Sequence, residues 1–269
     1  MKPATPLTAA RLFAAFLIAA FSLACDSNTE PAGSGGVSFS TVATPAALPA
    51  GAAVGAGELT QTDGEHTLVI TRVAVVLREI ELERVEDNDC PDGVEEDDCE
   101  EFEVGPTLLE MGLEGTVEQV VAIQAPAGSY DELEFDIHKP EDDTPEDLAF
   151  IAANPDFERV SIRVEGTFDG EDFLFLQDLN EEQELDLSPP LEVAEGAATT
   201  NVTLQLDVTT WFVRSDGSLI DPGTANKGGP NESLVEQNIE NSIEAFEDDD
   251  HDGDDDHHGH DGDGGHHGS

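Results

Sequence analysis

Apolar and polar residues alternate over residues 66–85, the pattern of a long β-strand with one buried face. Every second residue over Val73–Leu77 is Val or Leu, but beyond Arg78 the apolar positions change phase to Ile80 and Leu82. A shift of one residue turns side chains to the opposite face of a sheet. We therefore expect a β-bulge or bend near Arg78.

Further segments repeat this alternation, and turn-forming residues separate them. The expected strands are 37–42, 117–124, 130–138, 159–168, 172–179 and 201–213. Asp169-Gly170 is a hairpin signal, and Pro189-Pro190 is expected to be a turn. The passage 44–57 shows no clear period. Many short strands with frequent turns predict an all-β fold, an antiparallel β-sandwich over residues 37–230.

An amphipathic helix is predicted at 231–246, after the sandwich. Ser233 and Glu236 have the spacing of a capping box. Apolar residues recur at the spacing of one helix face, at positions Val235, Ile239, Ile243 and Phe246. We expect this helix to close over the sandwich rather than to bind a partner. A second, short helix is predicted at 145–153.

The chain is extremely acidic, with 61 Asp and Glu, 10 Lys and Arg, and a formal net charge of −51. Such a field repels nucleic acid and anionic lipid head groups, so charge-driven binding to either is excluded. It attracts divalent cations and basic partners. The acidity has three interpretations: a saline habitat, cation binding, or solubility alone.

Residues 1–24 have the features of a secretory signal: Lys2 and Arg11, then an apolar stretch that ends at Ala24. The stretch is too short to span a bilayer comfortably. Ser22-Leu23-Ala24-Cys25 resembles the lipobox of bacterial lipoproteins, although Ser22 and Leu23 invert its usual order. We expect Cys25 to be lipid-modified and to anchor the protein to the cell-envelope membrane, on the periplasmic or cell-surface side. Ordinary cleavage after Ala24 is the alternative.

The three cysteines fit an exported, anchored protein. Cys90 and Cys99 form a natural disulfide pair in an oxidising compartment, which leaves Cys25 for the lipid. Residues 25–36 are a Gly- and Ser-containing tether. The acidic run Asp87–Gly93, which includes Cys90, is either a calcium loop or a plain acidic loop.

Four short runs carry a family resemblance: Ile70–Val75, Ile80–Leu82, Leu108–Met111 and Ala125–Leu133. Together they resemble the domain-of-unknown-function family numbered 4382, found in prokaryotic lipoproteins and surface proteins. The resemblance implies a β-sandwich in the cell envelope and no established activity. The chain departs from the family pattern at 44–46, where Thr-Pro-Ala lacks the usual acid.

The family's Pro-x-Gly-x-Tyr turn corresponds to Pro126, Gly128 and Tyr130 in this chain. A glycine at this position permits a tight chain reversal. The aromatic ring can pack where the next strand begins.

The C-terminal segment 247–269 is expected to be disordered and to bind divalent metal ions. Imidazole suits Zn, Ni and Cu, whereas carboxylate suits Ca. The candidate ligands are Asp248, Asp250, His251, Asp252, Asp254, His257, His258, His260, His266 and His267. The spacing Asp-x-Asp-x-Asp-Gly from Asp248 to Gly253 matches the first half of a calcium loop, but Gly259 stands where the distal acid belongs. A formed calcium loop, loose metal buffering and a purely solvating tail are the alternatives.

We expect no enzymatic activity. The motifs of serine hydrolases, zinc proteases, phosphate loops and dinucleotide sites are absent from the sequence. The first hypothesis is a non-enzymatic envelope lipoprotein, a binding or assembly module whose protein partner is unknown and whose acidic tail collects cations. The second is a dedicated metal-buffering or scavenging protein, and the third is a hydrolase that uses carboxylates in a cleft.

Overall fold

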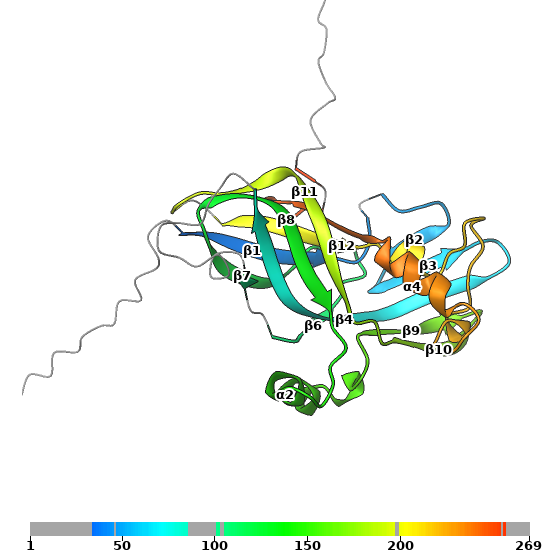
Figure 1. The fold of residues 1–269 in the computed structure, drawn as a ribbon. Coiled ribbons are helices and arrows are strands. Elements are labelled where there is room, and N and C mark those ends of the chain that lie inside the picture. The colour runs from blue at the N-terminus through cyan, green and yellow to red at the C-terminus, as the bar shows by residue number, and fades with distance from the viewer. Residues whose placement is uncertain are drawn as a thin grey trace, which may run out of the picture. The chain divides into compact units, whose positions relative to one another are not determined.

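In the computed structural model, the long alternating segment forms β4 (Thr67–Arg84), which pairs with β3, β5, β6, β8 and β9 (Figure 1). The structure describes residues 34–45, 47–85, 101–102, 105–196, 199–253 and 255–256. The expected bulge is confirmed: the register of β4 against β8 shifts between Arg78 and Glu81, and Glu79 has φ 49°. The shift lets Ile80 and Leu82 return to the buried face.

The described strands form two sheets, which confirms the predicted all-β, sandwich-like fold. One has nine strands: β2 (Ala52–Gly55), β3 (Glu58–Thr62), β4, β5 (Glu101–Phe102), β6 (Thr107–Glu110), β8 (Gly128–Ile137), β9 (Ile162–Phe168), β10 (Glu171–Gln177) and β11 (Glu181–Val193). The other has the order β13 (Ile243–Glu247), β12 (Thr200–Leu206), β1 (Ser34–Val42), β7 (Glu118–Pro126). Their pairings are antiparallel except β1 with β12, which is parallel.

Inward-facing side chains of both sheets, such as Phe135, Val202 and Leu206, form one hydrophobic core together with Trp211, which lies outside the sheets. A smaller cluster lies on the other face of β4, where Ala74 and Val76 pack against Phe150 and Phe157. Both faces of this part of β4 are therefore buried, although the alternation predicts only one buried face.

The helix at 145–153 is confirmed as α2 (Pro145–Ala153), capped by the Thr144 hydroxyl. It is followed by the 3-10 turn η1 (Pro155–Phe157). The hairpin prediction is also confirmed: Asp169 and Gly170, with φ 54° and 83°, join β9 to β10.

The predicted helix 231–246 is too long. Helix α4 spans Glu232–Glu240, and Asn231 is its N-cap residue. Ser233 and Glu236 therefore lie inside the helix and form no capping box. Val235 and Ile239 are buried as predicted, but Ile243 and Phe246 belong to β13, which pairs with β12. Pairing with β13 satisfies the backbone N–H and C=O groups at the edge of β12. This gain outweighs the tendency of the apolar residues at 243 and 246 to continue the helix.

Three other boundaries differ from the expectations. Strand β11 runs through Pro189-Pro190, because a register shift between Asp186 and Leu191 removes both prolines from its ladder with β8. Strand β12 ends at Leu206, and the next residues form α3 (Val208–Trp211) and, further on, the 3-10 turn η2 (Pro222–Thr224). Part of the passage without a clear period forms β2.

The turn before β8 has a different basis from the one expected. A Cβ atom at Gly128 would lie 2.1 Å from Nη2 of Arg84, so glycine is needed here for close approach of that side chain. Arg84 lies over the ring of the buried Tyr130 at 5.1 Å from its centroid. The Tyr130 hydroxyl donates to the carbonyl of Pro126 (2.7 Å), which closes the turn.

None of the helices in the described part of the chain is long and apolar enough to span a membrane.

Candidate cation-binding sites

The first candidate site lies directly after β13, the last strand of the four-stranded sheet. The backbone N–H of Asp248 still donates to the carbonyl of Asn201 on β12 (3.0 Å), so the sheet pairing continues one residue past Glu247. The chain then turns sharply: His251 and Gly253 have φ 59° and 84°. The N–H of Asp256 returns to the carbonyl of Glu247 (3.1 Å) and closes the loop.

The carboxylate of Asp248 is fully buried and serves as the centre of this loop. Its Oδ1 accepts the N–H of Asp252 (3.0 Å), and its Oδ2 accepts the N–H of Gly253 (3.2 Å) and the hydroxyl of Thr203 (2.8 Å). These donors offset the cost of removing the carboxylate from water. They also fix its orientation.

Behind Asp248 lies a buried polar network built on Asn201. Its Nδ2 donates to the carbonyl of Asp248 (2.9 Å) and to the hydroxyl oxygen of Thr203 (3.0 Å). Its Oδ1 accepts the hydroxyls of Ser38 (2.8 Å) and Ser40 (2.7 Å) on β1. Hydrogen bonds from Ser38 and Ser40 on β1 therefore orient the side-chain amide of Asn201. The amide in turn fixes the position of Asp248, where the loop begins.

Carboxylate oxygens of Asp248, Asp250 and Asp252 lie within 4.8 Å of one another. Oxygens that share a Ca²⁺ ion at 2.3–2.6 Å each have separations up to about this size. Burial, followed by the charges of Asp252, Asp256 and Asp248, raises the pKa of Asp250. The three acids can therefore hold a metal ion, and a cation would relieve their repulsion.

The expectation of a disordered segment 247–269 is wrong for its first part, because the network on Asn201 fixes residues 247–253 against the sheet. His251 is exposed, and its Nδ1 lies 3.2 Å from the carbonyl oxygen of Asp249, outside the three-carboxylate group. The remaining predicted ligands, Asp254, His257, His258, His260, His266 and His267, lie outside the described residues.

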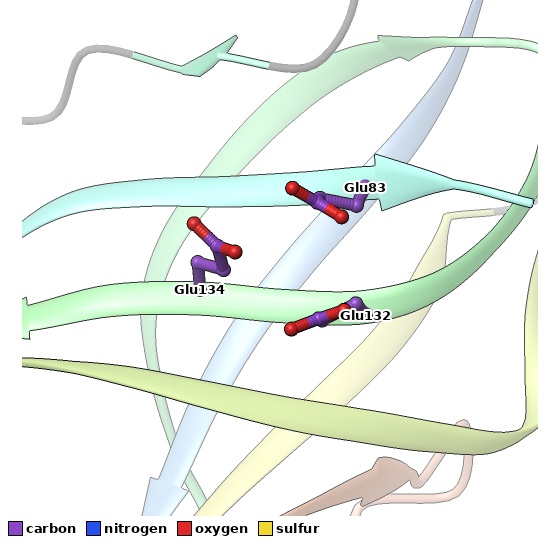
Figure 2. Close-up of side chains that lie close together, drawn as sticks. All are labelled: Glu83, Glu132 and Glu134. Carbon is purple, nitrogen blue, oxygen red and sulfur yellow. The ribbon is translucent and has the colours of Figure 1, made fainter. Parts of the chain in front are cut away.

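A second group of carboxylates, which the sequence analysis did not identify, lies on the outer face of the nine-stranded sheet. Glu83 on β4 and Glu132 and Glu134 on β8 offer oxygens within 4.8 Å of one another (Figure 2). Glu83 is directly opposite Glu132 in the ladder. Like charges that face each other across strands are destabilising.

Strand β11 adds acids on the other side of β8. Glu184 lies opposite Glu134, and Asp186 lies opposite Glu132. Burial first, and then Glu83, Glu182, Glu132 and Glu81, raise the pKa of Glu134 to about 7. The pKa of Glu132 is also raised, by burial and then by Glu83, Glu184 and other acids. Three adjacent strands thus present a carboxylate ladder, the set Glu81, Glu83, Glu132, Glu134, Glu184 and Asp186.

A signal for this ladder exists in the sequence, as Glu alternates with apolar residues in each of the three strands. The alternation alone does not reveal the partners, because it gives neither the neighbour of each strand nor the register. The chain has 61 acidic residues, so the sequence alone does not identify which of them are neighbours in the fold.

Like His251, the histidines His66 and His138 lie outside both carboxylate groups. His66 stacks on Phe168, and its Nδ1 lies 2.7 Å from Oδ2 of Asp169, a contact that raises its pKa. His138 is buried with Asp147 of α2, their Nε2 and Oδ1 atoms 2.7 Å apart. Cys25, Cys90, Cys99 and the acidic run Asp87–Gly93 lie outside the described residues.

No family model matches the sequence, and no curated protein matches it. Among solved structures, the chain is similar to MbnP from Methylosinus trichosporium, with a TM-score of 0.35 and 14% sequence identity. The similarity covers 71% of this chain and 79% of that one.

Proposed function

We propose that this chain is a non-enzymatic cell-envelope protein that binds calcium through the loop of Asp248, Asp250 and Asp252. One observation carries the proposal: a fully buried carboxylate is oriented by Thr203 and two backbone N–H groups, and two further carboxylates lie within 4.8 Å of it. The carboxylates of Asp250 and Asp252 repel each other and that of Asp248, and a cation bound between them would relieve this repulsion.

Calcium fits this loop better than zinc, nickel or copper. The described ligand atoms are all carboxylate oxygens, which hard cations prefer, and the flexible geometry of Ca²⁺ tolerates irregular donor sets. The glycine with positive φ stands at the sixth position of the loop, where calcium loops need a sharp turn. Asp256 contributes to the raised pKa of Asp250, and its Oδ2 accepts the N–H of Asp249 (2.7 Å), which holds a fourth carboxylate at this loop.

Because the distal bidentate acid is missing, we expect weak affinity, with a dissociation constant of about 0.1–1 mM, as in extracellular calcium modules. A protein with such a site responds to the calcium level outside the cell membrane. In the cytosol, where free calcium is far lower, the same loop would stay empty.

The second candidate function is transition-metal buffering by the histidines that follow Asp256. It rests on the interleaved His and Asp residues of 257–269. The two functions separate in a chain truncated after Asp256, which keeps the carboxylate loop and removes five histidines. We expect truncation to leave calcium binding unchanged and to remove zinc and nickel binding. Loss of calcium binding in the truncated chain would refute the assignment to the loop.

The lipid anchor at Cys25 and membership in the family numbered 4382 are part of the proposal. They are supported by the lipobox-like Ser22–Cys25 segment and by the shared short motifs. Substitution of Cys25 by Ala is expected to move the protein from the membrane fraction to the soluble extracytoplasmic fraction. An unchanged distribution would show that another feature holds the protein at the membrane.

A further inference from the structure

A groove of about 970 Å³ shares no lining residue with either carboxylate group. Its walls come from the segment before β2, from β3, from α3 and the loop after it, and from α4. Its apolar lining residues include Pro45, Pro49, Val213, Leu219 and Leu234. A volume of this size with a mixed lining is typical of sites for small organic ligands.

The acid content of the groove differs from that of the chain. Its lining includes two acids, Asp207 and Asp216, among nineteen residues, whereas the chain has 61 in 269. Both carboxylates already serve local structure. Asp207 accepts the N–H of Thr209 (3.0 Å), and Asp216 accepts the hydroxyl of Ser218 (2.7 Å).

Arg214 lines the groove and differs from the other basic residues. Six of the eight Lys and Arg that follow the signal segment are in ion pairs with Asp or Glu, namely Arg72, Arg78, Lys139, Arg159, Arg163 and Lys227. Arg84 stacks on Tyr130. The half-buried Arg214 donates from Nη2 to the neutral amide oxygen of Asn231 (3.0 Å), and no carboxylate of the described chain lies within ion-pair distance of it.

In so acidic a protein, a guanidinium without a carboxylate partner is unusual, because acids are available on almost every surface. The neutral partner is itself held in place, since Asn231 Nδ2 donates to the hydroxyl of Thr224 (2.7 Å). Arg214 therefore keeps a fixed position while most of its five N–H donors stay available. Asp216 lies close enough to feel its charge, but the hydroxyl and N–H of Ser218 are the main causes of that acid's lowered pKa.

A second polar group with an unmet hydrogen bond stands in the same groove wall. Gln61 is 5% exposed, and its Nε2 donates to the carbonyl of Thr209 (2.7 Å). Its Oε1 is buried and has no hydrogen-bond partner among the residues that the structure describes. An acceptor in that state costs about 1–3 kcal/mol unless a donor reaches it. A ligand with a hydroxyl or N–H group can supply such a donor after a small side-chain movement.

We propose that this groove binds a small amphipathic organic anion, whose single acidic group contacts Arg214 and whose apolar body lies against Leu219 and Leu234. Charge complementarity selects the acidic group, because Arg214 is the groove's one cation. The remaining acids of the protein repel the same ligand at long range. At 0.15 M salt that repulsion is screened beyond about 8 Å, whereas the direct contact with the guanidinium persists.

The sole tryptophan gives a local reporter for this groove. Trp211 is buried in α3, next to the lining residue Thr210, and its carbonyl accepts Nδ2 of Asn238, another lining residue. The probe is 8-anilinonaphthalene-1-sulfonate, which has an aromatic body and one negative charge. Energy transfer from Trp211 to the bound probe, in the mature chain at 0.15 M NaCl, reports binding at this groove. The uncharged N-phenyl-1-naphthylamine is the matched probe without the charge.

We expect one probe molecule to bind per chain, with displacement by octanoate and not by acetate. Arg214→Gln keeps a donor for Asn231 and should weaken binding of the sulfonate about tenfold or more, with little effect on the uncharged probe. Lys227→Gln removes the same charge from an exposed ion pair with Asp178 and should change binding less than twofold. Near-UV circular dichroism verifies that the variants are folded.

Equal binding of the sulfonate to wild type and Arg214→Gln would overturn the role of Arg214. Absence of energy transfer from Trp211 with both probes would overturn the groove as a ligand site. Both results are independent of calcium binding, since the Asp248 loop shares no residue with the groove.

Discussion

Asn201 and Asp248 are joined by two reciprocal hydrogen bonds: the N–H of Asp248 donates to the carbonyl of Asn201 (3.0 Å), and Nδ2 of Asn201 donates to the carbonyl of Asp248 (2.9 Å). This pair connects the interior of the four-stranded sheet to the acidic loop. The position of Asp248, the first of the proposed calcium ligands, is therefore set by a core residue and not by the loop alone.

Replacement of Asn201 by Ala should lower the free energy of unfolding by about 2–3 kcal/mol, because it leaves the hydroxyls of Ser38 and Ser40 buried without their acceptor. The same change should weaken calcium binding. Urea unfolding with and without calcium measures both effects. Gln183→Ala, which removes a solvent-exposed hydrogen bond from a half-buried side chain to the carbonyl of its neighbour, is the control and should change stability little. A stable Asn201→Ala variant with normal calcium affinity would refute the role of the network.

The carboxylate ladder should make stability depend on pH. The pKa of Glu134 is raised from 4.5 to about 7, first by burial and then by its acidic neighbours. Between about pH 4.5 and 7 the folded state therefore binds more protons than the unfolded state. The free energy of unfolding should fall as the pH rises through this window and level off above it.

Glu134→Gln removes this titration, so its unfolding free energy should fall less steeply over the same window. At pH 7.5 in the presence of EDTA we expect it to exceed that of the wild type by roughly 0.2–1 kcal/mol, the size of a cross-strand pair effect. Glu158→Gln, an exposed acid away from the ladder, is the control. Identical pH profiles for wild type and Glu134→Gln would show that the ladder does not titrate as described.

His138 and Asp147 should hold α2 against the sheet. Both side chains are almost fully buried, and their Nε2 and Oδ1 atoms are 2.7 Å apart. Asp147→Ala leaves His138 buried without this acceptor, so we expect a loss of about 2–3 kcal/mol. Hydrogen exchange should accelerate in Pro145–Ala153 before it does in β4. Asp142→Ala, at an exposed neighbour, should have neither effect.

Gly128→Ala should displace Arg84 from the ring of Tyr130, since the added Cβ would lie 2.1 Å from Nη2. The arginine can swing away, so the cost is its contacts with Tyr130 and with the carbonyl of Ala127, about 1–2 kcal/mol in total. If this is the cause, Gly128→Ala should cost much less in an Arg84→Ala background. Additive effects in this double-mutant cycle would contradict it. Gly55→Ala, where a Cβ meets nothing within 4 Å, is the control.

The local pattern predicted those parts of the fold that local chemistry decides. The phase change after Arg78 indicated the bulge at Glu79, Asp169-Gly170 indicated its hairpin, and Thr144 caps the helix that starts at Pro145. In each case the residues that determine the conformation are neighbours in the chain.

The errors arose where distant segments decide the conformation. Ile243 continues the apolar stripe of α4, yet it pairs with Leu206 in the sheet. Asp248 looks like part of a solvated tail, yet Asn201, 47 positions earlier in the chain, holds it in the interior. The pairing of β4, β8 and β11 likewise creates the carboxylate ladder, which no single segment reveals.

Calorimetric titration of the EDTA-treated mature chain with calcium tests the central claim most directly. We expect saturable binding with a dissociation constant of about 0.1–1 mM. This binding should be lost in Asp250→Asn/Asp252→Asn but not in Glu171→Gln/Asp172→Asn, which removes two exposed charges from β10. Equal calcium binding by the two double variants would contradict the account, because the ion would then be held by the general acidity of the protein.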